Sequence, residues 1–487
     1  MIRTRLATFA WSLAGGVALT SAPVGLVTGQ GLRVSAETRS FITVDTPVVA
    51  LVHVRVIDGK GSPAQDDQTV LIEHGIITAV GGSVAIPSGA QSLDLTGRSV
   101  FPGLVMLHEH LFYTMLGSAT WFVLNQEPFS FPRLYLAGGA TTIRTGGSVE
   151  PYTDLNLKAA IDSGRIPGPD IDITGPYLNG PGLPGIYQMH ALRGAAAARK
   201  MVDYWAELGV TSFKAYTNLT RTELKAAIDA THAHGLKITG HLCSVTFREA
   251  ARLGIDDLEH GLLVSTDFVP GKAPDQCPAG AQVDSSLLAL DLASAPVNEL
   301  IQELVSHKVA ITSTLPVFET FAPHRPRLVE GALDAMSTDA QIRYFDSRSL
   351  IAESADSTNL VLLRKEMAFE RAFAQAGGLL LAGSDPTGYG GVVAGFADQR
   401  EIELLVEAGF TPLEAIQVAT SNGARYLKRE TRIGSIAAGL LADLVVVRGD
   451  PTTNIRDIEN VELVFKRGVG YDPARLIESV RGHVGVN

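Results

Sequence analysis

Two histidines separated by a single residue, His108 and His110, follow the apolar run 101–107. Residues two apart on a β-strand point to the same face, so these imidazoles can bind one cation. His232 and His234 have the same spacing, but they lie at the expected end of a helix, where residues two apart diverge by about 200°. We therefore expect the first pair to bind a metal ion and the second pair to lie on the solvated surface.

Four further side chains that suit a metal site stand where other apolar runs end. They are Lys214, His241, His260 and Asp385. Imidazole and carboxylate groups suit zinc and its neighbours in the first-row series. Each residue alone has an ordinary alternative: a hydrogen-bonded core histidine, a solvated lysine or an aspartate that caps a turn. The coincidence of all six at strand ends favours a shared metal site.

The elements that must position these side chains alternate between short apolar runs and helical segments, which predicts an α/β fold with repeated βα units. We expect strands near residues 102–107, 140–144, 170–174, 210–214, 236–241, 256–260, 308–313 and 378–384. Eight strands indicate a closed (β/α)₈ TIM barrel, whose strands converge with their carboxyl ends on one face. The alternative is an open, doubly wound sheet, but no glycine-rich phosphate loop follows the first strand. Thr220 and Glu223 predict a capping box at the start of one helix.

Short alternating strands separated by Gly and Asp occupy residues 48–100, and the same pattern returns near the end of the chain. This pattern predicts a small β-sandwich domain formed from both termini, over 45–100 and 430–475, around a barrel over 101–429. Two excursions from the repeat, 177–192 and 264–297, follow strand ends, where they could cover the functional face.

Composition and charge narrow the class of protein further. The chain has 487 residues, 46% hydrophobic and 19% charged, which is typical of a globular protein. Its net charge of −11 and the lack of a basic run argue against a nucleic-acid partner. Cys243 and Cys277 allow at most one disulfide bond.

The chain begins with a basic segment and then has no charge from Leu6 to Ala22. We interpret residues 1–22 as a secretory signal peptide cleaved near Ala22, with a periplasmic or secreted destination. The alternative is a membrane anchor, which needs about 20 strongly apolar residues. This stretch contains Gly15 and Gly16, and Pro23 follows it, so it is not strongly apolar throughout. We therefore expect no membrane attachment after cleavage.

The ordered set of HxH, Lys, His, His and Asp resembles that of the amidohydrolase superfamily. Finer motifs are similar to its prolidase-like and imidazolonepropionase-like branch, which includes Xaa-Pro dipeptidase-like and ochratoxin-hydrolysing enzymes. These motifs are Phe101-Pro-Gly-Leu, Gly138-Gly-Ala-Thr-Thr-Ile-Arg and Ile433-Gly-Ser-Ile-Ala-Ala-Gly-Leu-Leu-Ala-Asp-Leu-Val-Val-Val. The resemblance covers roughly residues 45–475. It implies two divalent cations, with Zn²⁺ as the expected metal, and a CO₂-derived carbamate on Lys214 that bridges them.

Two positions depart from that branch. Arg144-Thr145 stands where relatives often have Arg-Asp, and Gly175-Pro-Tyr-Leu-Asn-Gly replaces a Gly-Gly-His-Gly stretch. Neither change affects a candidate ligand. We therefore expect the chemistry to be retained and the substrate to differ.

Paired cations lower the pKa of a shared water and polarise a carbonyl group. Asp385 would then act as general acid and base, although a plain ligand or cap is its alternative. Tyr216 could donate a hydrogen bond to the developing oxyanion or simply pack. Arg144 could clamp a substrate carboxylate or form a salt bridge inside the barrel. His190 could line the pocket or be solvated.

These patterns predict hydrolysis of a C–N amide bond in a small substrate: a dipeptide, an N-acyl amino acid or an amide-containing toxin. The first alternative is hydrolysis of an ester, lactone or phosphotriester at the same site. The second is a non-catalytic secreted protein with a structural metal, although structural zinc sites are closed and often rich in cysteine. The expected partner is a small molecule, and a homo-oligomer is possible.

Overall fold

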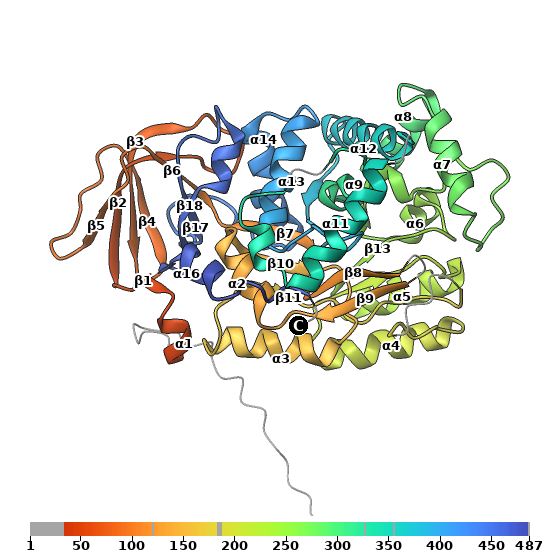
Figure 1. Cartoon of the computed structure of the whole chain (residues 1–487), viewed down its shortest axis with the longest axis horizontal. Helices are drawn as coiled ribbons and strands as arrows, with labels where there is room; N and C mark the ends of the chain where they lie inside the picture. Colours follow the sequence, from red (N-terminus) through yellow and green to blue (C-terminus); the bar gives the residue numbers. More distant parts are fainter. Residues whose placement is uncertain (1–33, 119–120, 183–187, 326–327, 354–355, 486–487) are drawn as a thin grey trace, which may run out of the picture. The chain divides into compact units, whose positions relative to one another are not determined.

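The computed structural model describes residues 34–118, 121–182, 188–325, 328–353 and 356–485. The predicted signal peptide, residues 1–22, lies outside the described residues. Within the described chain, no helix combines the length and the apolar character needed to cross a bilayer. Figure 1 shows a sheet domain beside a larger α/β domain.

Eight parallel strands of the described chain form the barrel. They are β7 (Leu104–Glu109), β10 (Ala140–Thr145), β11 (Asp170–Asp172), β12 (Ser212–Ala215), β13 (Lys237–Gly240), β14 (Asp257–Glu259), β15 (Ala310–Ser313) and β16 (Leu380–Ala382). They pair in the orders β7-β10-β11 and β12-β13-β14-β15-β16. The predicted α/β fold with a TIM barrel is confirmed, and each strand falls where the apolar runs predicted it.

Backbone hydrogen bonds connect the two sheets at both junctions. Gly175 N–H donates to Ser212 O at 2.9 Å, beside β11 and β12. Asp385 N–H donates to His108 O at 3.0 Å, just beyond β16 and in β7. The barrel strands are buried on both faces, which explains why they read as continuous apolar runs instead of alternating ones.

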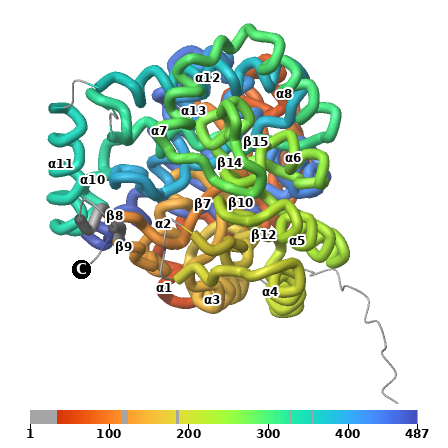
Figure 2. The backbone as a smooth tube through the Cα atoms, turned by 90° about the vertical axis from the view of Figure 1, so that its right-hand side faces the viewer, coloured from red at the N-terminus to blue at the C-terminus, as the bar shows by residue number. Residues whose placement is uncertain are grey.

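Helices cover the outside of these strands. They are α2 (Ser130–Ala137), α3 (Pro151–Asp162), α4 (Ala195–Glu207), α5 (Arg221–Ala233), α6 (Phe247–Leu253), α8 (Ala295–Ser306), α12 (Thr358–Gln375) and α13 (Phe396–Glu407). Figure 2 shows β7, β10, β12, β14 and β15 in the interior with helices around them. The predicted capping box of Thr220 and Glu223 starts α5, and Thr246 and Glu249 form another at the start of α6.

Strands from both ends of the chain build the predicted β-sandwich. They are β1 (Ile42–Val44), β2 (Val48–Val56), β3 (Gln65–Glu73), β4 (Ile76–Gly81), β5 (Gln91–Asp94), β6 (Arg98–Pro102), β17 (Leu444–Arg448), β18 (Val461–Lys466) and β19 (Val469–Tyr471). Their order is β1-β19-β18-β17-β6-β2-β3-β4, with β5 beside β2.

The junction between the two domains sets where the first barrel strand begins. β6 pairs with β17 from Pro102 opposite Leu444 to Arg98 opposite Arg448. Gly103 then links β6 to β7, and a Cβ atom there would lie 2.1 Å from the Thr141 hydroxyl. Only glycine allows this close approach. The pairing of β6 with β17 in the β-sandwich therefore determines where β7 of the barrel begins.

The remaining elements lie mainly in the connections. They are α1 (Ala36–Arg39), η1 (Gly261–Val264), α7 (Gly280–Ala289), α9 (Leu315–Glu319), α10 (Ala332–Ala335), α11 (Thr338–Glu353), α14 (Pro412–Gln417), η2 (Val418–Asn422), α15 (Gly423–Tyr426), η3 (Ile455–Glu459) and α16 (Pro473–Glu478). The hairpin of β8 (Phe112–Ser118) and β9 (Trp121–Gln126), directly after His110, was not predicted. A disulfide bond joins Cys243 to Cys277 and ties the 264–297 excursion to the end of β13.

Candidate metal centre

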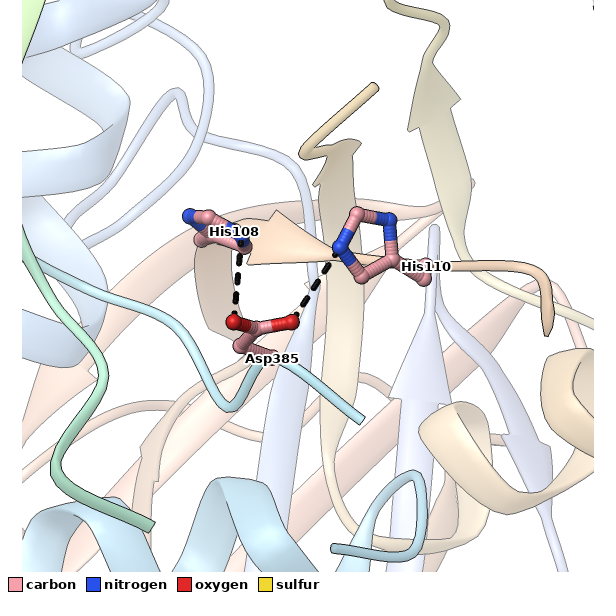
Figure 3. Close-up of side chains that lie close together, drawn as sticks. All are labelled: His108, His110 and Asp385. Carbon is pink, nitrogen blue, oxygen red and sulfur yellow. Dashed lines mark ion pairs between the residues drawn. The ribbon is translucent and has the colours of Figure 1, made fainter. Parts of the chain in front are cut away.

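The two histidines at the end of β7 point toward one carboxylate, as Figure 3 shows. His110 Nε2 lies 3.2 Å from Asp385 Oδ1, and His108 Nε2 lies 3.7 Å from Asp385 Oδ2. Candidate ligand atoms of the three residues lie within 4.8 Å of one another. The histidine side chains are buried, so a cation bound between them would be shielded from bulk water.

Asp385 reaches this position because the backbone turns sharply after β16. Its φ is +50°, in the left-handed region that non-glycine residues seldom adopt. The Thr387 hydroxyl donates to Asp385 Oδ1 at 2.9 Å and holds the carboxylate in place. Burial opposes ionisation of Asp385, but His108 and His110 outweigh it and hold its pKa well below the usual range. Asp385 is therefore an anion in the site.

The other three predicted ligands lie in the same place. Lys214 Nζ is 3.2 Å from His108 Nε2. The His260 ring lies 4.6 Å from the His108 ring and 4.6 Å from the His241 ring, measured between centroids. The structure thus brings together six side chains that lie in, or within three residues after, β7, β12, β13, β14 and β16.

Burial determines the protonation of the nitrogen atoms. It lowers the pKa of His108 and His260 well below the usual histidine range, and the neighbouring Lys214 adds to the effect. The pKa of His241 falls to about 3 for the same reasons. Burial also lowers the pKa of Lys214. Neutral imidazoles are the form that binds metals.

Hydrogen bonds through Nδ1 orient three of the histidines. Nδ1 of His108 contacts the Glu259 carboxylate, and Nδ1 of His110 lies 3.3 Å from Gly147 O. The Thr314 hydroxyl contacts His260 Nδ1 at 2.7 Å. Such partners fix the ring orientation and leave the other nitrogen available, as in known metal sites.

Arg144, a predicted substrate ligand, instead adopts the alternative role of a salt bridge inside the barrel. Its guanidinium is 1% exposed and donates to Leu107 O at 2.7 Å, Asp257 at 2.7 Å and Glu259 at 3.3 Å. An uncompensated charge at this depth is unfavourable, so the two carboxylates on β14 explain its burial. The Arg144 side chain is therefore held inside the barrel, where it supports the Glu259–His108 contact.

Tyr216 and His190 occupy different environments. The half-buried Tyr216 ring lies 5.0 Å from the His241 ring. Burial and the charge of Asp385 raise the pKa of its hydroxyl, which keeps it a hydrogen-bond donor. His190 is exposed on the loop before α4, next to residues outside the described part of the chain. His232 and His234 pair with two different aspartates at the surface, as their helical spacing predicted.

Sequence analysis missed two acidic residues that organise the site, Glu259 and Glu109. Asp257 and Glu259 are spaced two apart on a buried strand, and this spacing was a usable signal. Two carboxylates on one face of a buried strand require a buried partner such as Arg144. Glu109, between the two histidines, points to the neighbouring strand end and accepts a hydrogen bond from Ser384 N–H at 2.7 Å.

Candidate ligands that converge at the carboxyl ends of parallel strands define a class of barrel proteins with a metal centre on the functional face. The model of the amidohydrolase family matches residues 99–469, which is more than half of the chain. The chain therefore belongs to the amidohydrolase family, as its motifs predicted.

Curated relatives match only short segments. A dihydroorotase of Trichlorobacter lovleyi is 31% identical over 100 residues, which are 20% of this chain and 22% of that protein. A dihydroorotase of Thermoanaerobacter sp. is 45% identical over 56 residues, or 12% of each chain. The chain thus spans about a fifth or less of the length of these two relatives.

Solved structures match nearly the whole fold. A putative prolidase from Bifidobacterium longum has 24% identity and a TM-score of 0.63, with 89% of this chain and 98% of that chain covered. A Xaa-Pro dipeptidase has 21% identity and a TM-score of 0.65, with 87% and 100% covered. Ochratoxinase of A. niger has 16% identity and a TM-score of 0.61, with 90% and 99% covered. These likenesses support the fold.

Proposed function

We propose that this protein is a binuclear metal-dependent amidohydrolase that cleaves a C–N amide bond in a small substrate. A dipeptide, an N-acyl amino acid or an amide-containing toxin would fit this class. Family membership supports a hydrolase acting on carbon–nitrogen bonds. The observation that carries the proposal is the convergence of His108, His110 and Asp385 with Lys214 beside them.

The donor set fits divalent cations. Nε2 of His108 and Nε2 of His110 face Asp385, while their other nitrogens are occupied by Glu259 and a backbone carbonyl. His108, His110, Lys214, His241, His260 and Asp385 would hold two ions, and imidazole with carboxylate favours Zn²⁺. When bound, the ions would supply a water of lowered pKa and polarise the substrate carbonyl.

Lys214 fits this centre only as a carbamate. Its buried amine has a lowered pKa, and the neutral amine is the form that adds to CO₂. The amine nitrogen forms a bond to the CO₂ carbon as one C=O π bond of CO₂ breaks, and the nitrogen releases one proton to water, which leaves an anionic carbamate. An ammonium group 3.2 Å from His108 Nε2 would repel cations, whereas carbamate oxygens would bind them.

Asp385 and Tyr216 would move protons and bind charge during the reaction. The Asp385 carboxylate would accept a proton from the attacking water and pass it to the leaving nitrogen as the C–N bond breaks. The Tyr216 hydroxyl would donate a hydrogen bond to the carbonyl oxygen as negative charge develops there. Among the described residues, none forms a hydrogen bond with this hydroxyl, so it is available to a substrate.

We also propose that the protein works in the periplasm or outside the cell. The Cys243–Cys277 disulfide supports this location, because such bonds persist in oxidising compartments.

One set of measurements tests the proposed function. We expect about two divalent cations per chain by metal analysis, hydrolysis of dipeptides or N-acyl amino acids, and loss of activity on chelation. The panel should include lactones and phosphotriesters. Full activity after chelation would contradict the metal-dependent mechanism, and turnover of lactones or phosphotriesters without any amide hydrolysis would contradict the assigned bond type.

A further inference from the structure

A row of aromatic rings adjoins the candidate metal centre. Phe318 meets the His260 ring edge to face, with 5.8 Å between centroids. Phe321 lies 6.5 Å from Phe318, and Tyr389 lies 4.9 Å from Phe321, again edge to face. We call Phe318, Phe321 and Tyr389 the aromatic row. All three are half-buried, so each retains ring surface that a ligand could cover.

Ion pairs of Glu319, the last residue of α9, hold the segment that carries Phe318 and Phe321 in place. Glu319, the residue after Phe318, is 1% exposed and pairs with Arg325 and with Arg400, at 2.6 and 2.7 Å. Arg325 also pairs with Glu407 and Arg400 with Glu403, so carboxylates compensate the charge of both guanidinium groups. The Arg348 side chain donates to the backbone carbonyl of Ala322 at 2.9 Å.

The loop after Asp385 packs closely against the row. Gly388 has a φ of +74°, and a Cβ atom there would lie 2.9 Å from the Thr320 hydroxyl and 3.6 Å from the Phe321 ring. Glycine thus lets the loop that carries both Asp385 and Tyr389 approach α9. Asp385 and Tyr389 are consequently carried by one segment that packs against the end of α9.

Apolar surface beside a few convergent polar groups is typical of a small-molecule site. The charged groups next to the row, Glu319, Arg325 and Arg400, are occupied with one another. The rings themselves offer edge-to-face and stacking contacts, which favour a flat apolar group. Within the row, Phe318 is the ring that contacts a candidate metal ligand, His260.

We propose that the protein acts on amides that carry a planar apolar group, such as a phenyl ring, on one side of the scissile bond, and that Phe318 selects for this group. The proposal rests on the proposed amide hydrolysis and adds the substrate class. An ammonium group could also be attracted by aromatic faces. The experiment therefore includes a cationic substrate.

Substrate pairs that differ by one ring test the proposal. N-phenylacetylglycine is compared with N-acetylglycine, and glycylphenylalanine with glycylglycine and glycyllysine. We expect kcat/KM to favour the phenyl member of at least one pair by about tenfold. Phe318→Ala should reduce that preference to about threefold or less, measured as the ratio of kcat/KM for the two members of the same pair.

Matched variants separate specificity from folding. Phe318→Leu keeps an apolar side chain but removes the ring, and it should also lose the preference. Phe345→Ala makes the same truncation at a half-exposed ring on α11 and should retain it. An unchanged preference in both Phe318 variants, no preference in the wild type, or a preference for glycyllysine would overturn the proposal.

Binding of metal-chelating hydroxamates distinguishes failure of this proposal from failure of the proposed function. Phenylacetohydroxamic acid should bind the metal-loaded wild type about tenfold more tightly than acetohydroxamic acid, and Phe318→Ala should abolish the difference. This result supports the aromatic row even if none of the amides is hydrolysed, in which case only the assigned reaction fails. Equal binding of the two probes by the wild type, or binding of neither, overturns the proposal.

Discussion

The carboxylate of Glu109 accepts hydrogen bonds from both the backbone N–H and the hydroxyl of Ser384. Glu109 lies between His108 and His110 on β7, and Ser384 immediately precedes Asp385. One buried carboxylate thus sets the distance between the strand end with two candidate ligands and the segment with a third. Both side chains are fully buried, so water does not compete for these bonds.

Removing this link should weaken metal binding. We expect Glu109→Ala to lower metal affinity by about 10–100-fold, as for other residues that orient ligands. Glu109→Gln should retain most of the affinity, because its amide oxygen can still accept from Ser384 N–H. Competition with a fluorescent chelator measures both values. Equal affinity in Glu109→Ala and the wild type would show that Glu109 does not position the ligands.

Loss of the lysine should empty the centre. We expect Lys214→Ala to bind fewer than about one cation per chain instead of about two, because no carbamate can form. Isotopically labelled bicarbonate should give a carbamate resonance in the wild type and none in the variant. Lys237→Ala is the control, since this lysine lies on β13 with its amine 3.8 Å from the Tyr426 ring centroid. A full metal complement in Lys214→Ala would contradict the prediction.

The hydroxyl of Tyr216 should act on kcat more than on KM. We expect Tyr216→Phe to lower kcat by on the order of a hundredfold, since a donor to the developing oxyanion acts mainly in the transition state. Steady-state kinetics on the best amide substrate gives both constants. Tyr204→Phe removes a hydroxyl from a half-exposed ring on α4 and should change neither. A rise in KM at constant kcat would assign Tyr216 to ground-state binding instead.

Asp154 on α3 should make stability depend on pH. Burial raises its pKa to about 7, although a hydrogen bond from Ser148 opposes the shift. The folded protein therefore keeps a proton that the unfolded chain releases near pH 4. Its stabilising contribution is complete below about pH 4 and is lost as the pH rises through 7.

Asp154→Asn tests this dependence by denaturant unfolding at several pH values. The variant should show a flatter profile between about pH 4 and 8 and should be more stable than the wild type at the upper end by on the order of 1 kcal/mol. Asp162→Asn, on the same helix but paired with Lys158 at the surface, should keep the wild-type profile. Parallel profiles for wild type and Asp154→Asn would exclude this source of pH dependence.

The disulfide should stabilise the fold appreciably. Cys243 and Cys277 are separated by 34 residues in the sequence, and closing a loop of this size removes entropy from the unfolded chain worth about 4 kcal/mol. We expect a reductant to lower the free energy of unfolding by about this amount. The Cys243→Ser/Cys277→Ser variant should have the same free energy of unfolding as the reduced protein, and the reductant should not change it. An identical denaturation midpoint with and without reductant would contradict the prediction.

Local patterns were sufficient to predict the barrel strands and the residues at their ends. The two-residue period of a strand placed His108 and His110 on one face, and the helical period separated His232 from His234. The capping box of Thr220 and Glu223 likewise depends on neighbours three residues apart. Such features follow from backbone geometry within a single element, so they can be predicted without knowledge of the fold.

Partner choice between distant segments required the tertiary structure. Arg144 had two plausible roles, and only the position of Asp257, 113 residues away, assigned it to a buried ion pair. The contacts of Glu259 with His108 and of Glu109 with Ser384 span 151 and 275 residues. By itself, the sequence determined the candidate ligands and the barrel that carries them. Barrel closure decided which buried charges meet, because a charge in the interior is stable only beside the partner that the fold brings to it.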